Sequence, residues 1–452
     1  MGAAEVRGRE GEHTVHCMVP PNRSGFKRTP RSTLDSRRPC PQLPAVPLAD
    51  ALPALRSRNY RLFVGGQLVS YSGSWLQTVA QGWLVLELSN SAFVVGLVPA
   101  IATLPILLFT LYGGVVADRV NKRRVLVILQ SLMALEALAL AILTSTRIIS
   151  VPWVLAFAFV AGVVSAFEVP IRNALVAELV ERDALMNAIA LNSASFNLAR
   201  VLGPAAAGGV IAIGGVAACF YLNALSFGAV VWGLRRMELP PHVPPVDPPH
   251  PFEAFREGAR YVWLEPWPRT LLFLSGITAM FGFSFLVMLP VFARDTLKTD
   301  ASGYGVLVAS VGIGALVGAL GLAAVGARAR QRWLALGGAV GFGLALIAAA
   351  LTRGYWAALA LFTATGCLMV LHSISANTTV QQDSPDRLRG RVMGFYSLVV
   401  LGLAPFGSLQ VGWFAEHFGV RTAYIVGGSM CVLCAFLAGW WVRRSLPRRS
   451  MT

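Results

Sequence analysis

Charge is scarce in this chain. Asp, Glu, Lys and Arg together make up 13% of its 452 residues, whereas a soluble domain has about 25%. Hydrophobic residues account for 55%, and the mean hydropathy is +0.62. This composition excludes an ordinary soluble domain and predicts a protein that crosses a membrane several times.

Residues that could build a catalytic or metal centre are also scarce. The six cysteines form no framework, and Cys431 and Cys434 lie inside the last apolar run without a second pair. Helix packing explains that pair better than zinc binding or redox chemistry. The loops are short and have no paired acids with histidine, no nucleophile elbow and no metal constellation. We therefore expect no enzyme, no catalytic residue, no metal and no cofactor.

Long apolar runs dominate the chain instead. Each is near or above the roughly 20 residues that cross a bilayer as a helix. The runs are 61–88, 92–116, 125–146, 151–171, 187–212, 215–234, 270–293, 302–325, 333–352, 354–380, 391–414 and 420–442. The sequence therefore predicts an all-α membrane protein with twelve transmembrane helices, whose first partner is the lipid bilayer.

The net charge of +16 comes from short basic clusters between the apolar runs. This distribution fits membrane topology better than nucleic-acid binding, so we expect no nucleic-acid partner. Most Arg and Lys residues fall in alternate loops, and the opposite loops hold only Arg147, Arg294, Lys298, Arg353 and Arg421. The positive-inside rule then predicts that both termini are cytoplasmic, which agrees with an even number of spans.

Two stretches interrupt the apolar pattern. Residues 1–55 are rich in Pro, Arg, Ser and Gly and have no continuous apolar stretch, so we expect a disordered cytoplasmic segment and no secretory signal peptide. Residues 237–268 contain PPHVPPVDPPHP and an amphipathic piece, which predict a stiff cytoplasmic linker with a short surface helix. The linker separates two six-helix bundles, 56–236 and 269–445, and a cytoplasmic tail follows at 446–452. In such a repeat the substrate site lies between the halves near the midplane.

The stretch GGVVADRVNKRRV, residues 113–125, is a basic hairpin between two predicted helices. Asp118 lies near the C-terminus of the first helix, where the helix dipole disfavours a carboxylate. It therefore needs a cation, a donor or another helix N-terminus nearby. Gly113 and Gly114 would let a second backbone come close. Alternatively, the hairpin is a solvated turn whose basic residues only fix topology.

Three ionisable residues stand out within the first bundle: Glu136, Glu168 and Arg200. Such residues are costly in a bilayer and indicate function by default. Glu136 and Arg200 both lie roughly 18–20 Å deep at about 1.5 Å per residue. They could form a structural ion pair, handle substrate or protons, or leave Glu136 protonated toward lipid. Glu168 could pair with Arg172, four residues on, or reach Lys122 and lock the cytoplasmic helix ends in one state.

Kinks and polar groups supply the remaining candidates. Pro170, Gly203, Pro204, Gly208 and Gly209 are candidates for a gate or hinge, although plain helix packing explains them equally well. His372 could carry a proton near mid-membrane, or pack as a neutral side chain. The candidates for lining a cavity, which helix–helix hydrogen bonds could also use, are Gln67, Tyr71, Trp75, Gln77, Gln81 and Asn377.

The basic hairpin resembles the loop between helices 2 and 3 of the major facilitator superfamily, Gly-x-x-x-Asp-Arg-x-Gly-Arg-Arg/Lys. This motif is matched by Gly114, Asp118, Arg119, Lys122 and Arg123, while Asn121 stands in place of the motif's second glycine. Three segments are similar to sequences of one branch of this superfamily, which contains the enterobactin exporter and related bacterial efflux permeases. They are the first run, FEVPIRNALVAELV and NAIALNSASFNLARVLGPAAAGG. The resemblance covers about 56–445.

This resemblance implies alternating access and export driven by the proton gradient, in the bacterial inner membrane. The residues of the expected conformational switch are Gly114, Asp118, Arg119, Lys122, Arg123, Glu168 and Arg172. The fifth run is similar to an antiporter motif, but Ala207 occupies one of its glycine positions. We expect a monomer that exports an amphipathic small molecule, a siderophore or a drug, in exchange for protons. An importer with the same fold and a membrane sensor that transports nothing are the alternatives.

We predict that Asp118→Asn leaves the protein folded and slows transport, because the variant loses the carboxylate at the end of the helix where the dipole disfavours it. Expression in the membrane and thermal unfolding would check the fold, and solute flux in vesicles would check the rate. Normal turnover in the folded variant would contradict the role given to this carboxylate.

Overall fold

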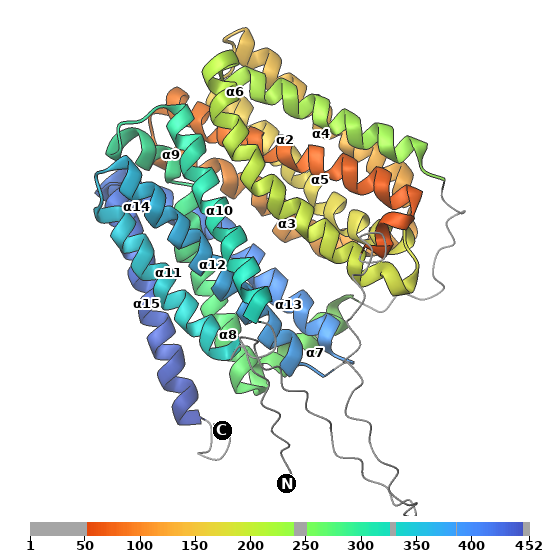
Figure 1. Ribbon diagram of the computed structural model, residues 1–452, viewed down its shortest axis with the longest axis vertical. Coiled ribbons are helices and arrows are strands. Elements are labelled where there is room, and N and C mark those ends of the chain that lie inside the picture. Colours follow the sequence, from red (N-terminus) through yellow and green to blue (C-terminus); the bar gives the residue numbers. More distant parts are fainter. Residues whose placement is uncertain (1–51, 239–250, 326–330, 386, 446–452) are drawn as a thin grey trace, which may run out of the picture. The chain divides into compact units, whose positions relative to one another are not determined.

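The computed structural model describes residues 52–238, 251–325, 331–385 and 387–445, which are predominantly helical (Figure 1). The tail, most of the predicted disordered segment and the proline-rich part of the linker lie outside these residues. Pro53–Arg56 differ from the expectation of disorder, because they form a 3₁₀ turn. The Ala54 amide donates to Asn187 Oδ1 at 3.2 Å, so order begins slightly before the boundary that composition predicts.

Five long helices build the first half. They are α2 (Arg58–Ser89), α3 (Ala92–Arg119), α4 (Lys122–Ser145), α5 (Val151–Glu178) and α6 (Leu185–Arg236). The side chains of Ser57, Ser91 and Asn121 cap α2, α3 and α4 by accepting backbone N–H groups. The 52-residue α6 is broken at Gly215, whose φ of 72° is open to glycine at little cost. It therefore comprises two spans joined by a tight turn.

The second half follows α7 (Pro251–Leu264), which occupies the predicted surface helix of the linker. Its helices are α8 (Pro266–Ile277), α9 (Leu289–Val291), α10 (Ala301–Val325), α11 (Gln331–Leu351), α12 (Tyr355–Asp383), α13 (Arg389–Gly402), α14 (Ala404–Phe418) and α15 (Val420–Ser445). α8, α9 and the π and 3₁₀ turns beside them form one candidate span, and α13 and α14 form another.

The described residues contain 10 helical stretches that are long and apolar enough to cross a membrane. One of them, Arg182–Arg236, contains both arms of the kinked α6 and therefore counts twice. α2 is not among the ten, since polar residues such as Gln67, Gln77 and Gln81 interrupt it, but its 32 residues are long enough to span a bilayer. The twelve predicted spans are therefore these ten stretches, with the second arm of α6 counted separately and α2 added.

Small residues set how closely the helices cross. α2 packs on α6 in the first half and α12 packs on α10 and α11 in the second, while α3–α14 and α6–α10 contacts join the halves. A Cβ added to Gly312 would lie 2.9 Å from Arg200 O, and one added to Gly208 would lie 2.8 Å from Ser302 O. Glycine therefore permits the close approach of α6 and α10, as expected between membrane helices.

Aromatic rings hold the irregular span between α8 and α9. Phe285 stacks on Phe362 with centroids 5.9 Å apart, and Tyr424 donates its hydroxyl to Phe285 O at 2.9 Å. Non-helical backbone is tolerated in a bilayer only where protein buries it and satisfies its polar groups. The ring cluster and the Tyr424 hydroxyl together meet that condition here.

Candidate functional site

The basic hairpin joins α3 to α4 and holds the ends of two other helices. Lys122, which is 7% exposed, pairs its Nζ with Glu178 Oε1 at 2.8 Å, at the end of α5. Arg123 donates to Leu234 O at 2.7 Å and to Arg235 O at 2.6 Å. These carbonyls lie at the C-terminus of α6, where cations are favoured.

Asp118 lies in the last turn of α3, and its side chain is outside the part of the structure that is described. Arg119 is exposed. Gly113 does bring α3 close to α5, since a Cβ there would contact Ala166 O. Gly114 does not, because nothing lies within 4 Å of an added Cβ. The expectation of close backbone approach therefore holds for the first glycine and is wrong for the second.

Glu168 pairs with Arg172 rather than with Lys122. Arg172 Nη1 lies 2.8 Å from both carboxylate oxygens, and Gln130 Nε2 donates to Oε1 at 3.2 Å. Since Lys122 is engaged by Glu178, the expected contact between Glu168 and the hairpin is absent among the described residues. α5 also continues through the proline that follows Glu168 and is not broken there.

Glu136 lies in an amide network and not beside Arg200. Gln77 Nε2 lies 3.4 and 3.2 Å from the two carboxylate oxygens, and Asn223 Nδ2 donates to Gln77 Oε1 at 2.7 Å. Glu136 is 5% exposed and forms no ion pair with any described residue. Its pairing with Arg200, one of the alternatives that equal depth allowed, is therefore wrong in this structure, because α4 turns the carboxylate toward α2.

Aromatic side chains from α2 and α6 form a strip beside these groups. Phe196 is 5.4 Å from Tyr71 and 6.0 Å from Trp75, measured between ring centroids. Phe196 is 42% exposed although it lies within a span. We call Tyr71, Trp75 and Phe196 the aromatic strip, and such a surface suits the apolar part of a ligand.

A guanidinium group lies at each end of the aromatic strip. Arg172 is 5.3 Å from the centroid of Tyr71, and Arg200 is 5.9 Å from that of Trp75, in the range of cation–π contacts. The positive charges of the two arginines are neutralised to different extents. Arg172 is paired with Glu168, whereas Arg200 has no carboxylate partner among the described residues.

Arg200 also reaches the other half of the molecule. Its Nη2 donates to Met369 Sδ of α12 at 3.9 Å, and a thioether is a weak acceptor. The charge of Arg200 is therefore little satisfied by protein groups. Its position between the halves is where a repeat transporter would place its substrate site.

The remaining polar candidates are buried, half-buried or hydrogen-bonded to neighbouring residues. Gln67 is buried, Gln81 is half-buried, and Asn377 accepts from Gln381 Nε2 at 2.6 Å. His372 is 1% exposed, and its Nδ1 lies 2.8 Å from Ala335 O. A carbonyl only accepts, so Nδ1 carries a proton, and this hydrogen bond joins α11 to α12.

The hinge candidates occupy tight contacts in an unbroken stretch of helix. A Cβ on Gly203 would lie 2.6 Å from Trp75 Cβ, while nothing lies within 4 Å of one on Gly209. α6 continues through Pro204, and its break is at Gly215. The helix is therefore not broken at the proline, and its non-helical residue lies eleven residues later.

Hydrogen bonds join the halves at the end of the helices opposite the basic loops. Glu416 Oε2 accepts from Ser91 Oγ and from the Phe93 amide, each at 3.1 Å. These donors lie at the N-terminus of α3, where the helix dipole favours an anion. Arg294 donates to Leu86 O at 3.4 Å, and Ser302 Oγ to Gly208 O at 3.0 Å.

Several residues of this site were not among the sequence candidates. They are Gln130, Asn192, Phe196, Asn223, Met369 and Glu416. Asn192 belongs to the site because its Oδ1 accepts from the Tyr71 hydroxyl at 3.4 Å. For two of them a signal was present, since Asn192 and Phe196 precede Arg200 at intervals of four and so share its helix face. The described residues contain no group of three His, Cys, Asp or Glu side chains that could hold a metal.

A family model described as transmembrane secretion effector matches residues 49–449. The staphyloferrin A transporter of Staphylococcus aureus is 26% identical over 397 residues, covering 85% of this chain and 96% of that protein. The multidrug efflux pump Tap of Mycolicibacterium fortuitum is 26% identical and covers 80% and 91%, respectively. The enterobactin exporter EntS of Shigella boydii serotype 4 is also 26% identical, covering 84% and 90%.

Solved structures agree on the fold. A bacterial homologue of the human lysosomal transporter Spinster, in an inward-facing and unoccupied conformation, superposes with a TM-score of 0.71 at 16% identity, covering 87% of this chain and 98% of that one. The nucleoside transporter NupG, as its D323A mutant, gives 0.69 at 14% identity, with 85% and 99% covered. These matches confirm the predicted all-α membrane fold, and the family match supports a transporter rather than an enzyme.

We predict that Arg172→Gln lowers stability, because it leaves the buried Glu168 carboxylate without its cation. Breaking a buried pair from one side costs about 3–5 kcal/mol, whereas removing both charges costs less. The apparent Tm in detergent should therefore fall further for Arg172→Gln than for the double variant Glu168→Gln/Arg172→Gln. An equal or larger fall in the double variant would mean that the pair adds little to the fold.

Proposed function

Because the chain belongs to the transmembrane secretion effector family of major facilitator transporters, we propose that it exports an amphipathic anion in exchange for protons. It is a multi-pass membrane protein and a secondary transporter, with siderophore and efflux transporters among its relatives. Bacterial relatives support a place in the inner membrane, and the basic loops support cytoplasmic termini. We propose a monomer.

The observation that carries this proposal is the position of Arg200. It is a membrane-embedded cation with no carboxylate partner among the described residues, and it lies over Trp75 at the junction of the two halves. A carboxylate or catecholate on a substrate would satisfy the guanidinium, while the aromatic strip would contact the apolar part. An anionic siderophore has this chemistry, whereas a cationic drug would gain nothing from the guanidinium.

The amide network supports Glu136 as the proton carrier. Its partner Gln77 is neutral, and so is Asn223, which donates to Gln77. A proton can therefore be gained or lost at Glu136 without breaking a buried ion pair. Glu168 is a weaker candidate, because Arg172 compensates its charge, and His372 is enclosed between two helices of one half. A change of charge at Glu136 would reach α2, which also carries Trp75 of the aromatic strip.

We propose that alternating access exchanges contacts at the two ends of the helices. The hydrogen bonds of Glu416 and Arg294 close the end opposite the basic loops in this conformation. Opening that end would release the N-terminus of α3, whose other end carries Asp118 and Arg119. The hairpin residues, with Glu168 and Arg172, would then stabilise the alternative state at the basic end.

The proposed exchange predicts a proton signal in inverted vesicles with an acid interior. An anionic siderophore should collapse the gradient only where the protein is present, because protons leave as the substrate enters. Glu136→Gln should abolish the collapse while substrate binding persists, since the amide cannot carry a proton. A wild-type protein that binds but gives no signal would favour uniport, import or sensing over exchange.

We predict that Arg200→Gln lowers kcat/KM for an anionic siderophore by about 10- to 100-fold, the usual worth of a hydrogen bond to a charged group. Arg200→Lys should retain part of the activity, because it keeps the charge but loses the planar fork. Uptake by inverted vesicles of a labelled siderophore, with a cationic dye as comparison, would measure this. Equal losses for both solutes would show that Arg200 is structural.

A further inference from the structure

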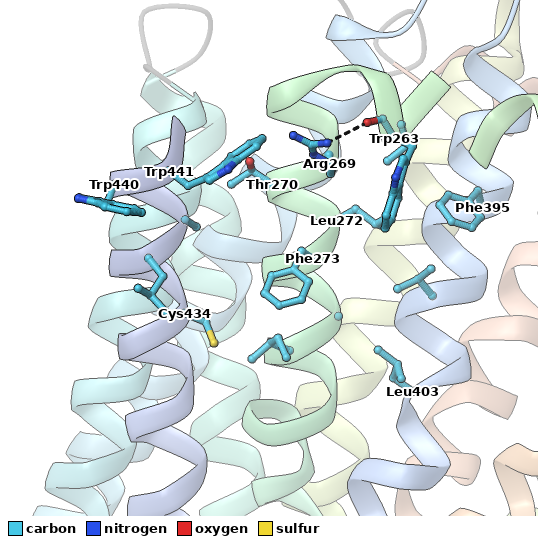
Figure 2. A pocket seen from close by; sticks show the side chains of 16 residues that line it. Trp263, Arg269, Thr270, Leu272, Phe273, Phe395, Leu403, Cys434, Trp440 and Trp441 are labelled. Atoms are coloured by element: carbon cyan, nitrogen blue, oxygen red, sulfur yellow. Dashed lines mark hydrogen bonds between the residues drawn. The ribbon is translucent and has the colours of Figure 1, made fainter. Parts of the chain in front are cut away.

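A second site lies on the outer surface of the second half, at the basic end of the helices. It is a groove of about 690 Å³ between α7, α8, α13 and α15 (Figure 2). This volume is within the roughly 300–1,000 Å³ of sites that hold small ligands. The groove is distinct from the aromatic strip, which belongs to α2 and α6 of the first half.

The groove is apolar along its length and cationic at one end. Phe273 and Leu437, which are 61% and 54% exposed, form part of its wall, and Arg269 is the charged residue of its lining. Arg269 lies at the start of α8, and Ile277 lies eight residues deeper, about 12 Å along the helix. A ligand that fits would therefore have an anionic head at the membrane surface and an apolar tail below it.

Figure 2 shows how Arg269 is held at the mouth. Its guanidinium lies 4.3 Å from the ring centroid of Trp441, and Nη1 donates to Trp263 O at 3.2 Å. No carboxylate pairs with it among the described residues. Arg444 adds a second cation close by, 4.0 Å from the centroid of Trp440. Tryptophan and arginine at this depth are typical of the boundary between lipid headgroups and acyl chains.

We propose that this groove binds one anionic phospholipid, with its phosphate on Arg269 and an acyl chain along α8 toward Gly276. Basic pockets between helices at this side of a membrane are suited to anionic headgroups. This lipid differs from the other lipids around the protein, because Arg269 selects a negatively charged headgroup and the 690 Å³ groove holds its acyl chain in one place. Gly276 faces Leu403 and Val399 at the inner end of the groove, so a side chain at this position would narrow it.

The test is native mass spectrometry of the full chain after reconstitution into vesicles of equal phosphatidylglycerol and phosphatidylethanolamine. The wild type should retain phosphatidylglycerol in preference. Arg269→Gln should lower the ratio of the two retained lipids about tenfold, which corresponds to one charged hydrogen bond, and Arg269→Lys should keep most of it. The matched control is Arg443→Gln, which removes the same charge from a residue that packs over Trp333, outside the groove lining.

A second variant tests the groove without changing charge. A Cβ at Gly276 would lie 3.1 Å from Leu403 Cδ1 and 3.3 Å from Val399 Cγ1, which are ends of flexible side chains. Gly276→Leu should therefore fold, fill the recess and reduce retention of the lipid. The proposal would be overturned if the wild type retained both lipids equally, or if the ratio of retained lipids were unchanged in Arg269→Gln. It would also be overturned by an equal fall of this ratio in Arg443→Gln, or by full retention of phosphatidylglycerol in Gly276→Leu. Because the readout is lipid retention, it is independent of the proposed export.

Discussion

The constraint on which this structure depends is that polar groups within a bilayer must find partners inside the protein. The two buried glutamates of the first half meet it in different ways. Glu168 has a cation, Arg172, and an amide, Gln130, so its charge is compensated in place. Glu136 has only neutral amides. The first arrangement fixes a charge, whereas the second can accept a change of protonation, and the proposed coupling role of Glu136 rests on this difference.

The junction of the halves follows from the same constraint. Glycine at the crossings brings backbone against backbone, and the exposed helix N-terminus of α3 is satisfied by Glu416 from the opposite half. A carboxylate is stabilised by the free N–H groups of a helix N-terminus. This contact joins the two halves only while α3 and α14 lie together. This polar contact lies beside an apolar cluster that also contains residues of both halves.

Sequence reasoning predicted what depends on composition and length: the spans, the linker helix at α7 and the transporter fold. It could not predict which side chains meet, because helical periodicity gives the face of a residue but not the rotation of one helix against another. Glu136 and Arg200 lie at similar depth yet point to different partners. Lys122 reaches Glu178 instead of Glu168 for the same reason. The break of α6 at Gly215 depends on a backbone torsion that the residue type only permits.

Arginines over aromatic rings show why partners matter more than residue type. Arg172 and Arg332 each lie over a ring and also pair with a carboxylate, Glu168 or Asp383. Arg200 and Arg269 lie over rings in the same way, without such a carboxylate among the described residues. The ring orients the guanidinium in all these cases, but only an uncompensated cation gains strongly from an incoming anion. The two sites inferred for anionic ligands, one between the halves and one facing lipid, rest on this shared difference in charge compensation.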